Sequence, residues 1–204
     1  MKTRIITISR EFGSGGRELG KRLAEMLGIA YYDSEIITEI ATRSGLATEY
    51  VNNIVEKKPI VYYPITIGRS FMTQPLQRVD FQSKIFGEQH ALITELADKS
   101  DCVIIGRCAD YILRDRKPLR IFVYADMAGR IARCRRKATP EEAEMTDRQL
   151  ARHIEDIDKG RREYYRYFTG QKWEDISHYD LCINTTDFEI KKLAEELVGF
   201  LCKE

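Results

Sequence analysis

Residues 3–27, TRIITISREFGSGGRELGKRLAEML, decide the fold, because they carry three signals in succession. The apolar run Ile5–Ile8 is typical of a buried strand in a parallel sheet. Gly13–Gly16 follows as a glycine-rich turn. Apolar residues then recur at helical spacing up to Gly28, which stands where a helix C-terminal glycine is expected: Leu19, Leu23, Met26 and Leu27. Strand, glycine turn and helix together form an arrangement that can hold a phosphate on backbone N–H groups and a helix N-terminus.

The glycine turn lacks two side chains of a standard phosphate loop. Such a loop reads G-x-x-x-x-G-K-[ST], with the lysine on the phosphates and the hydroxyl on magnesium. With Gly15 as the second glycine, Gly16 takes the lysine position, Arg17 the hydroxyl position and Arg10 the first glycine position. The turn is therefore either an altered phosphate loop or an ordinary strand–helix connection.

Composition favours one soluble globular domain. The 204 residues are 43% hydrophobic and 32% charged, and their net charge of +1 gives no general attraction to nucleic acid or membrane. Five cysteines without a C-x-x-C pair, together with the lack of a leader or long apolar stretch, predict free thiols in the cytoplasm.

Two further strand signals end in charged residues. Gly28–Asp33 predicts a short strand whose final carboxylate either meets a ligand at the sheet edge or caps a helix from about Ser34 to Ser44. Cys102–Ile105 predicts a buried strand followed by Arg107. This arginine either grips a phosphate or carboxylate, which we favour, or pairs with Asp110 on the surface.

The remaining segments alternate between helix and strand signals. Capping boxes at Thr139, Thr146 and Thr186 predict three helix starts. In chain order we expect a helix over Phe86–Ala97, a strand over Leu119–Tyr124, an arginine-rich helix over Met127–Lys137, a long helix from Asp147 to about Phe168, a strand over Leu181–Asn184 and a C-terminal helix. Such alternation predicts a mostly parallel sheet with helices on both faces.

The segment Pro59–Lys84 has no sustained period and follows a short helix expected over Leu46–Lys58. Its prolines and aromatic residues favour a substrate-covering element or a homodimer contact. Farther along, Asp158 and Arg161 lie one helical turn apart. This pair either positions the arginine for a ligand or is simple helix pairing.

These elements, in this order, resemble the cytidylate kinase-like branch of the P-loop nucleoside monophosphate kinases. The resemblance covers nearly the whole chain and is carried by Ser9–Gly16, Tyr31–Asp33, Val103–Arg107, Ile121–Tyr124 with Arg130 and Arg133, Asp158 and Arg161 with Tyr164-Tyr165, and Ile183–Thr186. It implies a three-layer α/β/α P-loop NTPase fold with a five-stranded parallel sheet. It also implies one domain over 1–204, with a core of 1–45 and 86–204, an NMP-binding insert over about 46–85 and a helical lid over about 134–165.

The resemblance implies ATP-dependent phosphoryl transfer, with Mg²⁺, to a nucleoside monophosphate such as CMP or to a related small acceptor. Carried over by position, the donor phosphates would meet Arg10, Gly13, Ser14, Gly15, Gly16 and Arg17. The acceptor would meet Asp33 and Arg107. Arg130, Arg133 and Arg161, with Asp158 as their partner, would neutralise the transferring phosphoryl group.

Three departures from the family pattern bear on this expectation. Gly16 replaces the lysine, Arg17 replaces the hydroxyl, and Ile37-Thr38-Glu39 stands where the family carries a Tyr-Arg pair. We expect Arg17 to take over from the lysine, with help from Arg10. The magnesium ligands stay unassigned, with water, Asp33 or Glu18 as options.

Three hypotheses follow from these departures. The chain is an active kinase with a rearranged loop, or a non-catalytic nucleotide- or anion-binding protein that kept the fold. The third hypothesis is an interaction protein without nucleotide affinity. The retained arginines favour the kinase, and the missing lysine favours the binding protein.

Overall fold

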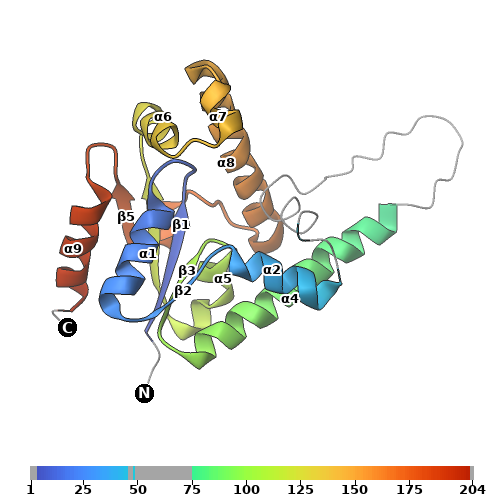
Figure 1. Ribbon diagram of the computed structural model, residues 1–204. Helices are drawn as coiled ribbons and strands as arrows, with labels where there is room; N and C mark the ends of the chain where they lie inside the picture. The colour runs from blue at the N-terminus through green and yellow to red at the C-terminus, as the bar shows by residue number, and fades with distance from the viewer. Residues whose placement is uncertain (1–3, 46–47, 49–74, 203–204) are drawn as a thin grey trace, which may run out of the picture.

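The computed structural model describes residues 4–45, 48 and 75–202 (Figure 1). Its centre is a five-stranded sheet in the order β2-β3-β1-β4-β5. Every pair of neighbouring strands is parallel. The strands are β1 (Ile5–Arg10), β2 (Ala30–Tyr32), β3 (Cys102–Ile105), β4 (Leu119–Tyr124) and β5 (Leu181–Asn184). Because all carboxyl ends lie on one edge, the predicted parallel sheet is confirmed and that edge is where a ligand is expected.

Helices cover both faces of the sheet (Figure 1). They are α1 (Gly16–Leu27), α2 (Glu35–Ser44), α4 (Pro75–Lys99), α5 (Ala109–Ile112), α6 (Met127–Arg136), α7 (Pro140–Glu144), α8 (Asp147–Thr169) and α9 (Ile190–Leu201). Helices α1 and α9 pack on one face, and α2, α4, α5 and part of α8 pack on the other. Helices α6 and α7 stand beyond the carboxyl edge. The three-layer α/β/α architecture expected from the sequence is therefore present.

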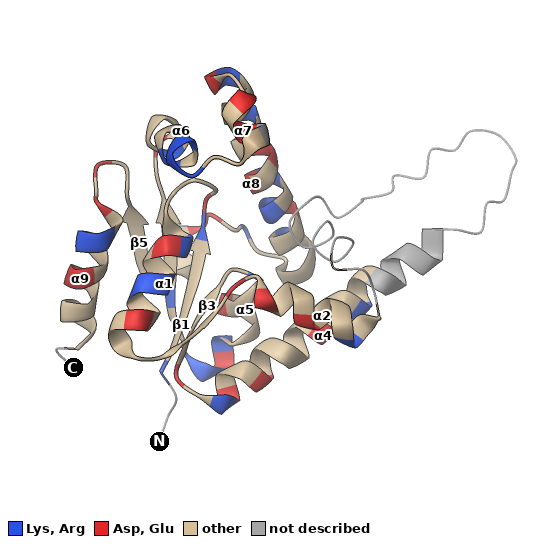
Figure 2. Ribbon diagram, viewed as in Figure 1, with Lys and Arg blue, Asp and Glu red and all other residues tan. Residues whose placement is uncertain are grey.

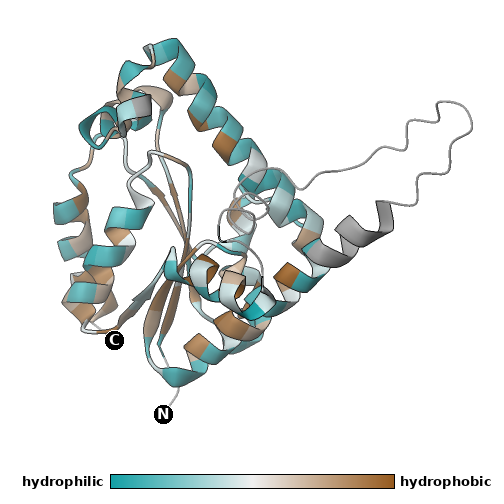
Figure 3. Cartoon of the chain, turned by 45° about the vertical axis from the view of Figure 1, so that its right-hand side comes forward, coloured by the Kyte–Doolittle hydropathy of each residue, from teal (hydrophilic) through white to brown (hydrophobic). Residues whose placement is uncertain are grey.

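Two apolar cores fill the space on either side of the sheet. Side chains alternate between the faces of β1, so Ile6 and Ile8 enter the core with α1 and α9, whereas Ile5 enters the other. Figure 3 shows apolar residues gathered on the strands and on the inward faces of the helices. In the part of the chain that the structure describes, no helix is both long and apolar enough to cross a membrane.

Several local predictions are confirmed by hydrogen bonds. Complete capping boxes begin α7 at Thr139 and α8 at Thr146. Gly28 ends α1 in a left-handed conformation. Met26, expected on the inner face of α1, is 47% exposed, and Phe200 of α9 is 62% exposed. The apolar stripes are therefore narrower than the sequence pattern suggests.

Two predictions about helix starts are wrong. We expected an irregular segment up to residue 85, but α4 begins at Pro75, since proline is well tolerated in the first turn of a helix. Thr186 does not cap α9, whose N-cap is Glu189, because its hydroxyl accepts a hydrogen bond from Asp126 N instead. The helix expected over residues 46–58 and the segment 59–74 lie outside the described residues, apart from residue 48.

Candidate functional site

The loop between β1 and α1 forms an open turn at the N-terminus of α1. Gly15 is the N-cap of that helix and adopts a φ of 86°, a conformation that favours glycine. Ser14 Oγ donates to the carbonyl of Glu11 at 2.8 Å and closes the turn. Within the described part of the chain, the backbone N–H groups of Gly13, Gly15 and Arg17 donate to no acceptor. Open N–H groups at a helix N-terminus can bind an anion, so the loop fits a phosphate.

Arg17 and Asp33 lie beside this loop and pair with each other. Arg17 Nε is 2.5 Å from Asp33 Oδ2, although the Arg17 side chain is 61% exposed. Tyr31 donates its hydroxyl to the same carboxylate at 3.3 Å, and burial raises the pKa of Tyr31, so it stays a donor. Asp33 is buried and does not cap α2, whose N-cap is Ser34. The capping alternative for Asp33 is therefore wrong, and Arg17 extends toward the end of β2.

Arg107 follows β3 in an unusual backbone conformation. Gly106, Arg107 and Cys108 have φ values of 65°, 58° and 53°, and such strain in non-glycine residues is concentrated at functional sites. The carbonyl of Arg107 accepts a hydrogen bond at 2.8 Å from Gln89 Nε2, and Gln89 Oε1 accepts one at 3.1 Å from the hydroxyl of Tyr164. These buried contacts fix the arginine at the sheet edge.

At this turn the structure contradicts one alternative drawn from the sequence and shows one supporting residue that the sequence analysis did not identify. The surface alternative for Arg107 is wrong, because the residue is only 7% exposed. Asp110 accepts a hydrogen bond from the hydroxyl of Tyr165 at 2.6 Å. Gln89 was missed as a site-supporting residue. Its signal was a polar side chain at an otherwise apolar position of a helical stripe, where it is fully buried.

A pocket opens next to these residues at the carboxyl edge of the sheet. It has about 340 Å³ of empty space, part of it open to solvent. Its lining includes three arginines and three aromatic residues, Arg10, Arg107, Arg161, Tyr164, Tyr165 and Trp173. Nothing local in the sequence links Trp173 to the pocket. The combination of guanidinium groups and aromatic faces suits a ligand that is anionic and partly flat.

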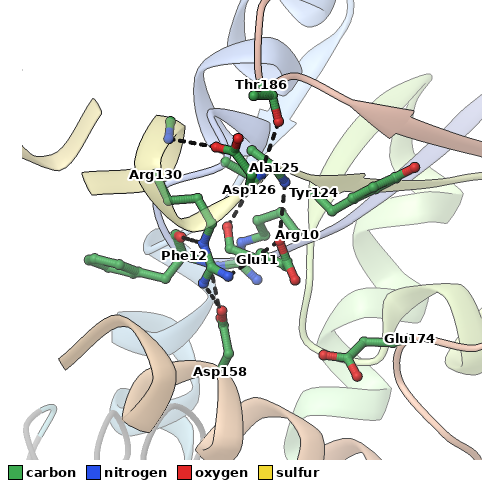
Figure 4. Close-up of polar contacts among 12 residues, drawn as sticks. Arg10, Glu11, Phe12, Tyr124, Ala125, Asp126, Arg130, Asp158, Glu174 and Thr186 are labelled. Carbon is green, nitrogen blue, oxygen red and sulfur yellow. Dashed lines mark hydrogen bonds and ion pairs between the residues drawn. The ribbon is translucent and has the colours of Figure 1, made fainter. Parts of the chain in front are cut away.

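Asp158 of α8 joins the loop to α6 (Figure 4). Its Oδ1 accepts hydrogen bonds from Phe12 N at 2.9 Å and from Arg161 Nη1 at 3.3 Å, and its Oδ2 pairs with Arg130. Arg130 Nε also donates to the Phe12 carbonyl at 2.7 Å. The predicted pairing of Asp158 with Arg161 along the helix is present, and the buried carboxylate, only 2% exposed, also reaches the loop.

Two of the arginines of α6, Arg130 and Arg133, point in different directions. Arg130 points to the loop and also lies 3.4 Å from the carboxylate of Glu11. Burial raises the pKa of Glu11 above its ordinary value, and the N–H of Ala125 and the charge of Arg130 offset this only in part. Arg133 donates to the carbonyls of Thr185 and Phe188 after β5, and burial lowers its pKa. The expectation that both arginines face one phosphoryl group is therefore not met by their present contacts.

Positive charge nevertheless dominates this edge. Six arginines lie at or near the loop and the pocket, against the carboxylates of Glu11, Asp33 and Asp158: Arg10, Arg17, Arg107, Arg130, Arg133 and Arg161. Figure 2 shows basic residues on α6, beside the loop, and residues of both signs along α8. Because the whole chain carries a net charge of only +1, the excess is local and would attract an anionic ligand.

The same residues do not form a protein-held magnesium site. The described residues contain no group of three or more His, Cys, Asp or Glu side chains able to hold a metal ion. Both carboxylates considered from the sequence are engaged by cations, since Glu18 pairs with Arg22 and Lys137 and Asp33 pairs with Arg17. The site therefore fits a phosphate group and offers no ready set of carboxylate ligands for magnesium.

Comparisons with known proteins show the family of the chain. The model of the cytidylate kinase-like family matches residues 5–187. A cytidylate kinase from Desulfurococcus amylolyticus is 28% identical over 88% of this chain and 83% of its own length. One from Aeropyrum pernix is 26% identical over 90% of this chain and 91% of its own length.

Two solved structures share the fold. An uncharacterized protein from Eubacterium ventriosum has a TM-score of 0.70 and 23% identity, over 99% of this chain and 100% of that one. Shikimate kinase from Acinetobacter baumannii in complex with shikimate has a TM-score of 0.55 and 15% identity, over 98% and 94%. At these identities the likeness shows the fold alone, which this chain shares with shikimate kinase.

Proposed function

The chain belongs to the cytidylate kinase-like family, and from this premise we propose that it is an ATP-dependent kinase for a small phosphate-bearing acceptor. The acceptor is a nucleoside monophosphate such as CMP or a close relative. The observation that carries the proposal is the position of the arginine-lined pocket beside the open loop, on one edge of the sheet. Phosphoryl transfer needs mainly positioning and charge neutralisation, which these groups supply.

Each half of the site has a role in this proposal. The N–H groups of Gly13–Arg17 hold the donor phosphates, with the helix α1 N-terminus adding its partial positive charge. Asp33 and Arg107 face the acceptor, and Arg161 reaches both the loop and the pocket. Arg130 and Arg133, with Asp158, would complete the charge neutralisation after a rearrangement of their present contacts. ATP is expected to arrive with magnesium.

The proposed domain organisation follows the family. Residues 1–204 form one domain, with α7 and most of α8 inside the lid at about 134–165. Most of the insert at about 46–85 lies outside the described residues, and its C-terminal part belongs to α4. A homodimer contact through this insert stays a prediction.

A second candidate is a nucleotide- or anion-binding protein that keeps the fold without the reaction. Gly16 at the lysine position favours it. So do the contacts of Arg130 and Arg133, which bind backbone carbonyls rather than an open cavity. Both candidates predict nucleotide affinity, whereas an interaction protein does not.

Thermal unfolding with added ligands tests the proposal. ATP with magnesium at about 100 times its Kd should raise Tm by about 5–10 °C, because a ligand that binds only the folded state stabilises it by about 2.7 kcal/mol. Adenosine, which lacks the phosphates, should give little shift. One of CMP, UMP, AMP and GMP should add a further shift. An unchanged Tm with every nucleotide would contradict the proposal and favour the interaction protein.

A further inference from the structure

Arg10, which family position assigns to the donor phosphates, lies on the acceptor side in the structure. It is the last residue of β1 and is only 6% exposed. Its guanidinium reaches the Gly106 turn after β3, with Nη2 4.0 Å from Asp33 Oδ1. It also lines the pocket together with Arg107 and Arg161. Of these neighbours, Asp33 and Arg107 belong to the acceptor half of the proposed site, and Arg161 reaches both halves.

Two glycines leave the space that Arg10 fills. A Cβ added to Gly16 would lie 2.5 Å from Cβ of Arg10 and 3.1 Å from Cβ of Val123. A Cβ added to Gly106 would overlap Nη1 of Arg10. The stem of Arg10 therefore requires a glycine at position 16, and its guanidinium lies directly against the left-handed Gly106. The absence of the loop lysine and the presence of Arg10 are linked, because a lysine side chain at position 16 would collide with this arginine.

Arg17 and Arg10 differ in how far their side chains are exposed to water. The side chain of Arg17 is 61% exposed and held by Asp33, so water screens much of its charge. The guanidinium of Arg10 is buried in a wall that already contains Arg107 and Arg161, where like charges disfavour one another. Asp158 engages Arg161 and Arg130, and Asp33 lies between Arg17 and Arg10. Because the guanidinium groups of Arg10, Arg107 and Arg161 line one pocket, a phosphate monoester placed there can accept bidentate hydrogen bonds from them.

We infer that Arg10 determines acceptor specificity by binding the acceptor's phosphate together with Arg107, so that this chain carries its extra cation on the acceptor side and not on the donor loop. The inference rests on the proposed function. It predicts that donor affinity depends on backbone N–H groups, and that acceptors without a phosphate bind weakly.

Isothermal titration of Arg10→Met tests the inference, with CMP, inorganic phosphate and ATP–magnesium as probes. Methionine keeps an unbranched stem and removes the charge. Affinity for CMP and for phosphate should fall about 10- to 100-fold, the usual effect of losing a hydrogen bond to a charged group, while ATP affinity changes less than about 3-fold. Arg10→Lys should recover part of the loss. Arg120→Met, which breaks a pair with Asp180 near the start of β4, is the control and should change none of the three.

A second variant tests the link between Arg10 and the loop. Gly16→Ala should weaken CMP binding by displacing Arg10, although position 16 belongs to the donor loop. In an Arg10→Gly background, which removes the clashing Cβ, the same alanine should have no further effect on CMP affinity. Additive effects on CMP affinity would contradict the link. Circular dichroism of each variant checks that the fold is intact.

The outcomes separate the inference from the proposed function. Loss of ATP affinity in Arg10→Met with CMP and phosphate affinity intact would overturn the inference. Wild-type protein that binds ATP but neither CMP nor phosphate would also overturn it, leaving the kinase proposal with another acceptor. Wild-type protein that binds phosphate through Arg10 but does not bind ATP would support the pocket and contradict the kinase proposal. Binding of none of the three probes would contradict both.

Discussion

At the scale of single residues, Asp158 ties the candidate phosphate loop to α6 and α8. Its carboxylate contacts Phe12, 146 positions earlier in the chain, and two arginines. The sequence predicts its pairing with Arg161 from their spacing, but not the contacts with the loop. Such long-range contacts depend on how α8 packs against β1, which no local pattern encodes.

Asp158→Asn should cost about 3 kcal/mol of the free energy of unfolding. Asparagine can still accept a hydrogen bond from Phe12 N, but it leaves Arg130 and Arg161 buried beside a neutral group, and breaking one partner of a buried ion pair is strongly destabilising. Urea unfolding measures the cost. The matched control is Asp156→Asn, an exposed position on the same helix, which should change stability by less than about 0.5 kcal/mol. Equal effects of the two substitutions would remove Asp158 from this role.

Asp110→Asn should become more stabilising as the pH rises. Burial raises the pKa of Asp110 above its ordinary value of 3.8, and the hydroxyl of Tyr165 only partly offsets this. The folded state therefore holds the proton more tightly than the unfolded chain. The contribution of Asp110 is fully present below its unfolded pKa and is lost as the pH rises through the folded pKa.

The measurement is urea unfolding of Asp110→Asn and wild type at about pH 4 and about pH 8. The difference in unfolding free energy, variant minus wild type, should increase toward the higher pH because asparagine does not ionise. Asp156→Asn again serves as the control, with a difference that changes little with pH. A constant difference for Asp110→Asn would show that this carboxyl ionises as readily in the folded protein as in the unfolded chain.

At the scale of elements, the sequence predicts those helix ends that depend on neighbouring residues alone. The capping boxes at Thr139 and Thr146 and the terminal glycine of α1 are where the sequence places them, since caps depend on residues within one turn. The capping box predicted at Thr186 is wrong because its hydroxyl accepts a hydrogen bond from a distant backbone group, Asp126 N. The sequence does not predict the start of α4 at Pro75, because a proline and a weak apolar period are also typical of irregular structure.

Gly15→Ala tests the phosphate loop as an element. Alanine would be strained at a φ of 86°, and its Cβ would lie 2.7 Å from Cδ1 of Ile190 in α9. We expect a loss of about 2 kcal/mol in the free energy of unfolding and a smaller Tm shift with ATP.

The matched control for Gly15→Ala is Gly87→Ala in α4. A Cβ there meets nothing within 4 Å, so alanine should stabilise the helix by about 0.5–1 kcal/mol through its better helix propensity. Chemical unfolding and ligand-dependent Tm shifts of both variants give the comparison. If Gly15→Ala were as stable as wild type and bound ATP equally well, the loop would not need its present conformation.

At the scale of the whole molecule, the alternation of strands and helices predicts the sheet and the edge where charged residues meet. The structure places Asp33 beside Arg10 and Arg17, and Arg107 in one pocket with Arg10 and Arg161. The sequence does not reveal the direction of each side chain. Arg10 turns toward the end of β3 because Gly16 and Gly106 leave room for it, and those two glycines are 90 positions apart.

Phosphorus NMR of ATP, magnesium and CMP incubated with the protein tests the central claim most directly, because it follows each phosphate separately. The account predicts that ADP and CDP appear together in equal amounts. It also predicts that Gly15→Ala slows their formation and that replacing CMP with cytidine stops it. If ATP binds but its signals stay unchanged with CMP and with the other three nucleoside monophosphates, the kinase proposal is contradicted. The chain would then be a nucleotide-binding protein that keeps the kinase fold.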